Sequence, residues 1–324
     1  MRVGVDVGGT NTDAVLIDGR TILAKVKTAT TADVTTGIQQ SLTGLAAAAD
    51  VGLDEVDAVM IGTTHFTNAF VEGKELSSVA VVRLCLPATQ AVPPQADWPE
   101  AALARVRTRS FLCHGGREFD GRPISAVAPD ELARVAAQIR ELGLESVAVS
   151  GVFSSADPTD ELLAGELLAE QLGDLPISLS HEIGRIGMLE RENATIVNAC
   201  LRRLAQRTVA AFEDAVASVG LRVPVYVSQN DGTLAGMALT ERYPVTTFTA
   251  GPTNSMRGAA FLSGIDDGAV VDIGGTTADI GVVQHGFPRE TGTEALIGGV
   301  RTNFRLPDVV SLGIGGGSLA DLAS

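Results

Sequence analysis

"VGVDVGGTNTDAVLI" (residues 3–17) is nearly repeated as "AVVDIGGTTADIGVV" (residues 269–283). In each stretch an apolar run ends at Asp-x-Gly-Gly-Thr, and a second Asp opens another apolar run. Two apolar runs around a glycine-rich turn predict a β-hairpin. The copies stand near opposite ends of the chain, too far apart for a solenoid repeat, so they predict two duplicated domains.

The composition is that of a well-packed α/β protein with an acidic surface. The chain has 324 residues, of which 45% are hydrophobic and 36 are glycine, enough for two domains with many tight turns. The net charge of -15 argues against a nucleic-acid-binding surface and against attraction to anionic membranes. Cys85, Cys113 and Cys200 match no metal-binding or redox spacing. We see no signal-like segment and no membrane-spanning apolar run, and therefore expect a cytoplasmic protein.

The apolar periodicity predicts α/β alternation along most of the chain. Three short strands within residues 2–27 are followed by a helix at 31–52, a strand at 56–62, a short helix at 64–73 and a strand at 77–86. Residues 87–129 are richer in proline and turn residues, so we expect an insertion there.

We place the domain boundary near Gly184, before a long helix that begins at Met188. The first domain is then residues 1–184 and the second is residues 185–324. In the first domain, a long stretch after Asp13 forms the next strands and helices. Far fewer residues follow Asp279 in the second domain. We therefore expect the second domain to be incomplete at its C-terminus.

Both copies carry the groups of a phosphate-binding turn. The first aspartate of each copy, Asp6 or Asp272, ends an apolar strand, where its carboxylate can project from the sheet. The paired glycines have no Cβ atom, so the turn can adopt positive φ and a phosphate can approach the backbone N–H groups. Threonine hydroxyls add further donors. The candidate phosphate ligands are Gly8, Gly9, Thr10, Thr12, Gly274, Gly275, Thr276 and Thr277.

The four aspartates of the two copies are the candidate catalytic residues. Mg²⁺ is usually held by one or two carboxylates plus substrate phosphates, which makes Asp6 and Asp272 the candidate metal ligands. Asp13 and Asp279 lie on the return strands, where each can bind the turn or orient a water. A plain tight hairpin capped by its aspartate is the alternative for one copy, but two copies with matched flanking strands argue against it. Neither a P-loop nor a Rossmann glycine pattern is present.

A third glycine-rich stretch, "VVSLGIGGGS" (residues 309–318), follows the second copy. An apolar strand that runs into a glycine-rich turn before a helix admits a flat ring or a phosphate against the backbone. A flexible tail is the alternative. The stretch occupies the same strand-then-turn position as "VMIGTTHFTNA" (residues 59–69) after the first copy, which favours a binding role for Gly315, Gly316 and Gly317.

The two hairpins and the glycine-rich loop resemble the phosphate-1, phosphate-2 and adenosine elements of the superfamily that contains actin, sugar kinases and heat-shock chaperones. That resemblance implies an α/β fold of two ribonuclease-H-like (actin-like ATPase) domains around a nucleotide cleft. Within the superfamily, the chain resembles the hydantoinase/oxoprolinase family, specifically its ATP-dependent hydantoinase A-type subunit. The matching stretches run in order over nearly the whole chain: "DVGGTNTDAVL", "IGTTHFTNAFVEGK", "SHEIGRIGMLERENATIVNACL", "QNDGTL", "TFTAGPTNSMRGAA", "DIGGTTADIG" and "SLGIGGGSLA".

The family resemblance implies an ATP- and Mg²⁺-dependent enzyme that opens a cyclic amide, such as a hydantoin or 5-oxoproline, together with a B-type subunit. The carbonyl oxygen would be phosphorylated and the activated ring hydrolysed. Phosphoryl transfer itself needs mainly positioning and charge stabilisation. The two hairpins would hold the phosphates from opposite sides, and Gly315, Gly316 and Gly317 would lie near adenosine. A homo-oligomer is also compatible with the sequence.

Candidate substrate residues follow strand ends or open the long helix. They are Thr63, Thr64, Asn68, Arg185, Arg191, Asn193, Asn230 and Asp231. Structural alternatives exist for each group: the threonines can cap a short helix, and Arg191 can form a solvated pair with Glu190. Residues 230–232 make a good turn without any ligand. His65 is a candidate general base, although a histidine at a helix start is more often structural.

Three other functions remain open on the sequence. A carboxylase subunit of the same family would use the ATP site to activate a ketone or bicarbonate. A small-molecule kinase would transfer phosphate to a hydroxyl and leave a stable phosphorylated product. A nucleotide-gated clamp like actin or the chaperones would hydrolyse ATP slowly and would not respond to hydantoins, lactams or ketones.

Overall fold

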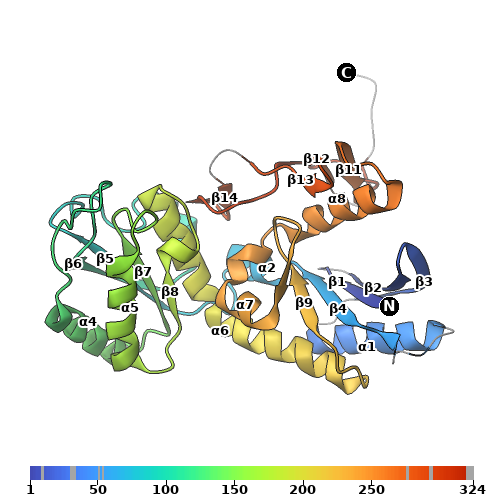
Figure 1. The fold of residues 1–324 in the computed structure, drawn as a ribbon, viewed down its shortest axis with the longest axis horizontal. Helices are drawn as coiled ribbons and strands as arrows, with labels where there is room; N and C mark the ends of the chain where they lie inside the picture. Colours follow the sequence, from blue (N-terminus) through green and yellow to red (C-terminus); the bar gives the residue numbers. More distant parts are fainter. Residues whose placement is uncertain are drawn as a thin grey trace.

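The computed structural model describes residues 1–8, 11–29, 34–49, 52, 55–274, 277–291 and 295–318. These residues form an α/β structure with two large sheets, one long helix that joins them, and a smaller third layer (Figure 1). In this described part of the chain, no helix has the length and apolar character needed to cross a membrane. Four predicted phosphate ligands lie outside the described residues: Gly9, Thr10, Gly275 and Thr276.

The first sheet contains the first copy of the repeated stretch. Its strands are β1 (Arg2–Val7), β2 (Asn11–Asp18), β3 (Thr21–Ala29), β4 (Ala58–Thr63), β9 (Val225–Ser228) and β10 (Leu234–Gly236), in the order β10-β9-β4-β1-β2-β3. β1 pairs antiparallel with β2 and parallel with β4, and β4 pairs parallel with β9. An antiparallel hairpin flanked by parallel strands is the ribonuclease-H-like arrangement that the resemblance implied.

One face of the first sheet packs on helices, and the other face is open. Successive side chains of a strand point to opposite faces, and in β1 the side chains of Val3, Val5 and Val7 are buried whereas Asp6 is exposed. The buried face packs against α1 (Val34–Ala48) and the C-terminal part of α6 (Met188–Ser218). The polar residues of β1 and its neighbours therefore lie on the face that these helices leave uncovered.

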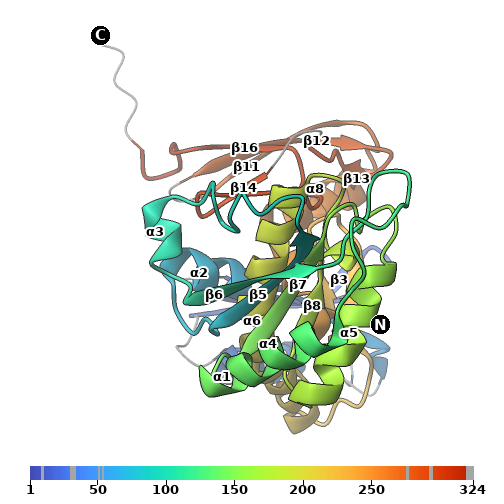
Figure 2. The same cartoon turned by 90° about the vertical axis from the view of Figure 1, so that its left-hand side faces the viewer.

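The second sheet is parallel and buried on both faces. Its strands are β5 (Val79–Leu86), β6 (Thr108–His114), β7 (Ser146–Gly151) and β8 (Ile177–Leu179), in the order β6-β5-β7-β8. Every residue of β7 is buried, as expected for a parallel strand covered on both sides. Helices α4 (Pro129–Glu141) and α5 (Thr159–Leu172) cover one face, and the N-terminal part of α6 covers the other (Figure 2).

The remaining elements connect the sheets and carry the second copy. The short helices are α2 (His65–Glu72), α3 (Glu100–Leu103), η2 (Ser180–Glu182), α7 (Met237–Arg242) and η3 (Pro244–Thr247). Helix α8 (Ala250–Ser263) lies between the first sheet and a third sheet (Figure 1). That sheet contains β11 (Gly268–Ile273), β12 (Ala278–Gln284), β13 (Phe287–Pro288) and β16 (Val309–Leu312). A ribbon of β14 (Ala295–Ile297) and β15 (Val300–Thr302) packs against α6.

The two copies of the repeated stretch fold into matching hairpins. The aspartates lie opposite each other in the same register, Asp6 with Asp13 and Asp272 with Asp279. In each turn the first glycine donates its backbone N–H to the carbonyl three residues later, at 3.0 Å from Gly8 and 2.8 Å from Gly274. The expected duplication of the hairpin is therefore present in the structure.

The surroundings of the two hairpins differ. β4 pairs parallel with β1, whereas β16 pairs antiparallel with β12, and no strand in the described ranges pairs with the other edge of β11. The expected correspondence between residues 309–318 and 59–69 is therefore not realised. The physical difference is that β4 is held between β1 and β9, and the second hairpin has no counterpart of β9 among the described residues.

The sheets do not divide at residue 184, where we expected the boundary. β9 and β10 come from beyond that residue and complete the first sheet, whereas β5, β7 and β8 come from before it and form a separate sheet. Residues 87–129 are not a plain insertion either, because they contain β6, an edge strand of the second sheet. Apolar periodicity marks a strand but does not say which strands pair, since pairing joins residues far apart in the chain.

A buried ion pair joins the second sheet to α6. Arg83 of β5 donates from Nε and Nη2 to the carboxylate of Glu192, at 2.7 and 2.5 Å, and both side chains are buried. Ser150 of β7 donates a further hydrogen bond to Glu192 at 2.8 Å, and Arg83 also donates to the Val92 carbonyl. Both charges are therefore neutralised inside the core.

Glu192→Gln should lower the free energy of unfolding by about 3–5 kcal/mol, because it leaves Arg83 as an unpaired buried charge. Urea denaturation followed by circular dichroism measures this loss. The control is Arg207→Ala, which breaks an exposed ion pair with Glu75 at 2.8 Å and should cost less than about 1 kcal/mol. Equal losses for the two variants would contradict a stabilising role for the buried pair.

Candidate functional site

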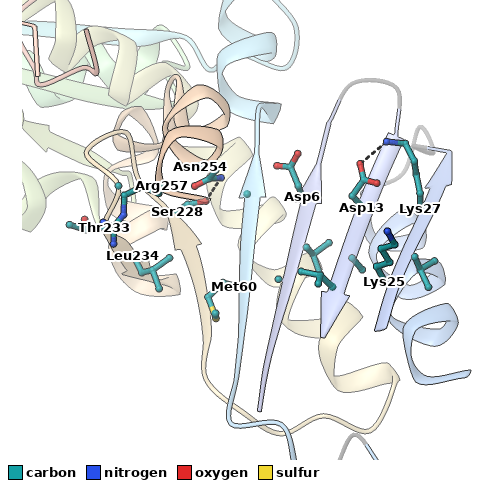
Figure 3. Close-up of a pocket in the computed structure, with 17 residues that line it drawn as sticks. Asp6, Asp13, Lys25, Lys27, Met60, Ser228, Thr233, Leu234, Asn254 and Arg257 are labelled. Atoms are coloured by element: carbon teal, nitrogen blue, oxygen red, sulfur yellow. Dashed lines mark hydrogen bonds and ion pairs between the residues drawn. The ribbon is translucent and has the colours of Figure 1, made fainter. Parts of the chain in front are cut away.

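A cavity of about 850 Å³ lies on the open face of the first sheet, and we call it the large cavity (Figure 3). Strands β1 to β4 form its floor, and the β9–β10 turn and α8 form its wall. Small-molecule and cofactor sites commonly measure about 300–1,000 Å³, so a nucleotide-sized ligand matches its volume. The polar and glycine residues that matter here are Asp6, Asp13, Lys25, Lys27, Gly62, Ser228, Gly232, Thr233, Asn254 and Arg257.

Asp6 is an unpaired carboxylate in the large cavity. No hydrogen bond or ion pair joins the Asp6 side chain to another described residue. Asp13, by contrast, forms an ion pair with Lys27 at 3.1 Å (Figure 3). Desolvation by the surrounding protein raises the pKa of Asp6, the Asp13 carboxylate raises it further, and Lys27 opposes both. A carboxylate that lacks a counter-ion and is disfavoured in its charged form is suited to bind a cation.

The large cavity fits the expected magnesium ion by the chemistry of its donors. Mg²⁺ prefers oxygen ligands, keeps several waters and is usually held by one or two carboxylates when substrate phosphates complete its coordination. Asp6 offers such a carboxylate, and Lys25, Lys27 and Arg257 offer positive charge to phosphates around it. The described residues contain no group of three or more His, Cys, Asp or Glu side chains that could hold a metal ion by themselves.

Gly62 allows α8 to approach the carboxylate of Asp6. It lies opposite Asp6 in the β1–β4 register, and a Cβ atom there would stand 2.7 Å from both Asp6 Oδ1 and the side-chain nitrogen of Asn254. Asn254, on α8, donates to the Ser228 hydroxyl at 3.0 Å (Figure 3). Ser228 donates in turn to the Ile61 carbonyl at 3.2 Å. These bonds fasten α8 to the carboxyl ends of β4 and β9, beside Asp6.

Sequence reasoning missed several residues of the large cavity: Gly62, Lys25, Lys27, Ser228, Asn254 and Arg257. Asn254 and Arg257 lie within "TFTAGPTNSMRGAA", one of the stretches that match the family, but the sequence did not predict a binding role for either residue. The Arg257 guanidinium lies 3.9 Å from the centroid of the Phe287 ring and donates to the Gly286 carbonyl, so it ties α8 to the β12–β13 turn. Lys27 gave no sequence signal, because polar residues alternate along any half-exposed strand.

The second hairpin does not line the large cavity. Asp272 and Asp279 lie in a narrow hollow together with residues of α8. Because α8 also contributes Asn254 to the large cavity, the helix stands between the two pairs of aspartates. Asp279 accepts a hydrogen bond from the Ser311 hydroxyl at 2.5 Å. The structure does not bring Asp6 and Asp272 into one cavity, and their joint metal binding remains a prediction.

Thr12 points away from the large cavity. Strand alternation puts Thr12, Ala14 and Leu16 on the face covered by helices, and all three are buried. The structure therefore does not support Thr12 as a phosphate ligand. Gly8, at the end of β1, remains at the turn where we expected it.

The glycine-rich loop after β16 contacts the second turn. Gly316 donates its backbone N–H to the Gly274 carbonyl at 2.9 Å, and Gly315 donates to the Ser318 hydroxyl at 3.0 Å. Residues 315–317 therefore lie beside the turn of the second hairpin, and none of them lines the large cavity. Their position near adenosine remains a prediction.

A second cavity, of about 350 Å³, brings together three predicted substrate residues from distant parts of the chain, and we call it the small cavity. Arg185 comes from the loop before α6, and Asn230 and Asp231 come from the β9–β10 turn. Other residues of the same turn line the large cavity. Residues 228–233 therefore form a wall that the two cavities share.

Three other predicted substrate residues lie at the start of α2 and line neither cavity: Thr63, Thr64 and Asn68. The Thr63 hydroxyl accepts the His65 backbone N–H at 3.1 Å, and Asn68 donates to the Thr64 hydroxyl at 3.3 Å. Desolvation lowers the pKa of His65, and its ring packs edge-on against Phe66. These contacts favour a structural role for this helix start.

Arg191 is a buried anchor of the small cavity. Its guanidinium donates to the Ser180 hydroxyl and to the carbonyls of Gly151 and Arg185. It thereby holds the loop that brings Arg185 to the cavity. The alternative of a solvated pair with Glu190 is wrong, because Arg191 is 1% exposed.

Asn193 is a structural residue of α6. It is buried, accepts a hydrogen bond from Trp98 Nε1 at 2.7 Å and donates to Asp97 at 3.0 Å. Its amide therefore joins α6 to the proline-rich segment before α3 and lines neither cavity.

Asp6→Asn should slightly stabilise the folded protein at neutral pH. The raised pKa means that ionisation of Asp6 costs free energy in the folded state relative to the unfolded state. The gain should stay below about 1 kcal/mol because solvent reaches the carboxylate. It should disappear when the pH falls below the ordinary aspartate pKa of 3.8, since Asp6 is then protonated in both states. Urea unfolding at neutral and acidic pH measures the difference, and a loss of stability at neutral pH would contradict an unpaired charge.

Two family models together match nearly the whole chain. The model described as "Hydantoinase/oxoprolinase N-terminal region" matches residues 2–172, and the model described as "Hydantoinase/oxoprolinase" matches residues 191–324.

Curated relatives include subunits of two enzymes. The chain is 28% identical over 350 residues to the caprolactamase subunit alpha of Pseudomonas jessenii, which covers 99% of this chain and 49% of that protein. It is 25% identical over 354 residues to the acetophenone carboxylase gamma subunit of Aromatoleum aromaticum, which covers 98% of this chain and 47% of that protein. The chain therefore spans about half the length of the curated relatives it matches.

Solved structures share the fold. The crystal structure of the ATP-dependent caprolactamase from Pseudomonas jessenii matches with a TM-score of 0.82 and 25% identity, over 99% of this chain and 49% of that chain. The nucleotide-free structure of acetone carboxylase matches with a TM-score of 0.75 and 18% identity, over 97% of this chain and 48% of that chain. The fold is the actin-like ATPase type of α/β fold that the motifs implied. Because the two family models cover both hairpins and the segments between them, the chain belongs to the hydantoinase/oxoprolinase family.

Proposed function

We propose that the chain is the ATP-dependent subunit of an enzyme that opens a cyclic amide by phosphorylating its carbonyl oxygen. The observation that carries the proposal is the unpaired Asp6 carboxylate beside Lys27 in a cavity of nucleotide size. Family membership supports it, because a relative of similar fold is named as an ATP-dependent caprolactamase.

The chemistry explains why ATP is needed. An amide is a poor electrophile, because resonance places electron density on its oxygen. When bound, Mg²⁺·ATP supplies the phosphoryl group: the amide oxygen forms a new P–O bond as the bond to ADP breaks. Water then adds to the activated carbon, and the C–N bond breaks with the ring nitrogen leaving as an amine. Hydrolysis of the resulting acyl phosphate yields a carboxylate and inorganic phosphate.

The residues of the large cavity supply positioning and charge in this proposal. Asp6 binds the magnesium ion through its carboxylate. Lys27 and Arg257 neutralise phosphate charge, and Asp13 keeps Lys27 beside Asp6 through their ion pair. Positioning and electrostatic stabilisation are most of what a protein contributes to phosphoryl transfer.

A ketone carboxylase subunit is the second candidate. It is favoured by the likeness to the acetophenone carboxylase gamma subunit and to acetone carboxylase. The nucleotide site would be the same, and the phosphorylated oxygen would belong to a ketone or to bicarbonate. Because the curated relatives are named as subunits, we also propose that this chain acts with a partner, a B-type subunit in the hydrolase case.

Asp6→Asn should weaken the binding of Mg²⁺ with a non-hydrolysable ATP analogue by about 10- to 100-fold, the value of a lost charged contact. Isothermal titration calorimetry measures the affinity. Since the pKa of Asp6 is raised, wild-type affinity should begin to fall at a higher pH than for an ordinary aspartate. Asp18→Asn, at the end of β2 and outside the cavity, is the matched control. Equal affinities for both variants and the wild type would remove Asp6 from the nucleotide site.

With its partner subunit, the chain should release phosphate from ATP faster when a hydantoin, 5-oxoproline or a lactam is present. A phosphate-release assay with each compound tests the reaction class. Stimulation by acetone with bicarbonate, and not by cyclic amides, would favour the carboxylase. A stable phosphorylated sugar would indicate a kinase, and turnover that no compound changes would indicate a nucleotide-gated clamp.

A further inference from the structure

The small cavity is lined by a largely buried asparagine, Asn230, whose side-chain amide has no hydrogen-bond partner among the described residues. The residue is 6% exposed. The Oδ1 and Nδ2 atoms of Asn230 are not fully buried, so solvent in the cavity reaches them. A ligand that offers a donor and an acceptor there can replace this water and leave neither amide group unsatisfied. The side chain of Asn230 is therefore suited to bind a polar ligand.

The backbone of Asn230 is held from two sides. Its N–H donates to the Thr246 carbonyl at 2.7 Å, and its carbonyl accepts a hydrogen bond from the Thr253 hydroxyl at 3.0 Å. Thr246 belongs to η3 and Thr253 to α8. The backbone that carries the side-chain amide is therefore held in place.

The charges around the small cavity balance one another. Glu182 accepts a hydrogen bond from Arg242 at 2.5 Å, and Arg305 pairs with Glu290 at 3.0 Å. Burial and a hydrogen bond to Glu182 raise the pKa of Tyr243, so its phenol stays protonated. Arg185 lies 3.6 Å from the same Glu290 carboxylate, and Asp231 accepts a hydrogen bond from the Thr233 hydroxyl at 2.6 Å. The positive charges of Arg185, Arg242 and Arg305 balance the negative charges of Glu182, Glu290 and Asp231. A neutral ligand therefore fits this cavity better than an ion.

We propose that the small cavity binds the cyclic amide itself, with the side-chain amide of Asn230 paired to the N–H and C=O of the ring. This inference rests on the proposed function and assigns its substrate to a definite place. In a small lactam or hydantoin the amide is cis, so its N–H and C=O leave the same edge of the ring. The side chain of Asn230 presents a matching C=O and N–H edge, and the two edges form a pair of hydrogen bonds. A ketone offers an acceptor but no donor.

The position of Asn230 also relates the substrate to the nucleotide. Residues 228–233 separate the two cavities, so a ring bound at Asn230 lies across a single turn from the large cavity. On the opposite side of the small cavity, Arg191 holds the loop of Arg185. Hydrogen bonds thus hold both the Asn230 backbone and the Arg185 loop.

Ligand binding tests the inference without turnover. The probes are δ-valerolactam, its N-methyl derivative and cyclohexanone, which have the same ring size but differ in the ability to donate a hydrogen bond. We expect the wild-type chain to bind δ-valerolactam about tenfold more tightly than the other two probes, the value of one lost hydrogen bond to a buried partner. Titrations observed by ligand NMR give the affinities, and equal binding of the three probes overturns the inference.

Asn230→Ala should weaken δ-valerolactam binding by about tenfold and abolish the preference over the N-methyl derivative. Gln138→Ala removes an exposed side-chain amide on α4, outside both cavities, and is the matched control, which should bind like the wild type. If circular dichroism shows that Asn230→Ala is unfolded, Asn230→Asp replaces it, because a carboxylate accepts from the ring N–H but cannot donate to its C=O. A lactam preference that survives in the folded variant overturns the inference.

The wild-type chain also separates this inference from the proposed function. Binding of a Mg²⁺-bound ATP analogue without any lactam preference would overturn the substrate site and leave the nucleotide function standing. A lactam preference without nucleotide binding would support the substrate site and contradict the proposed function.

Discussion

The burial of α6 between two sheets is the constraint on which both cavities depend. Its N-terminal part packs against the second sheet, where Glu192 neutralises Arg83, and its C-terminal part packs beneath the first sheet with Phe212 in the core. A helix that is buried on most of its surface cannot shift without opening a core. The loop that enters α6 is therefore held in place, and it brings Arg185 to the turn that carries Asn230.

Helix α8 connects the two candidate sites through neighbouring residues. Thr253 binds the carbonyl of Asn230 beside the small cavity, and Asn254 binds Ser228 next to the carboxylate of Asp6 in the large cavity. A movement of α8 would change both cavities together. The same helix separates the first hairpin from the second, so its position also decides how closely their aspartates approach.

The sequence could identify the aspartates of the hairpins but not their environments. Asp6 and Asp13 were recognisable because they repeat around a glycine turn, yet which of them is neutralised depends on Lys27, a residue on a third strand. The burial of Thr12 could have been foreseen from strand alternation, since it shares a face with Ala14. The surroundings of Asp6 could not have been foreseen, because Gly62, Ser228 and Asn254 come from three elements that meet only in the folded chain.

The sequence by itself determined the two hairpins and the family, because hairpin formation depends on residues that are neighbours in the chain and the family motifs are local. Only the tertiary structure decided that β9 completes the first sheet, that Arg83 is neutralised by Glu192 and that Arg185 shares a cavity with Asn230. Each of these contacts joins residues far apart in the sequence, and its free energy depends on the packing of the whole chain. Periodicity, capping and composition carry no information about such pairings.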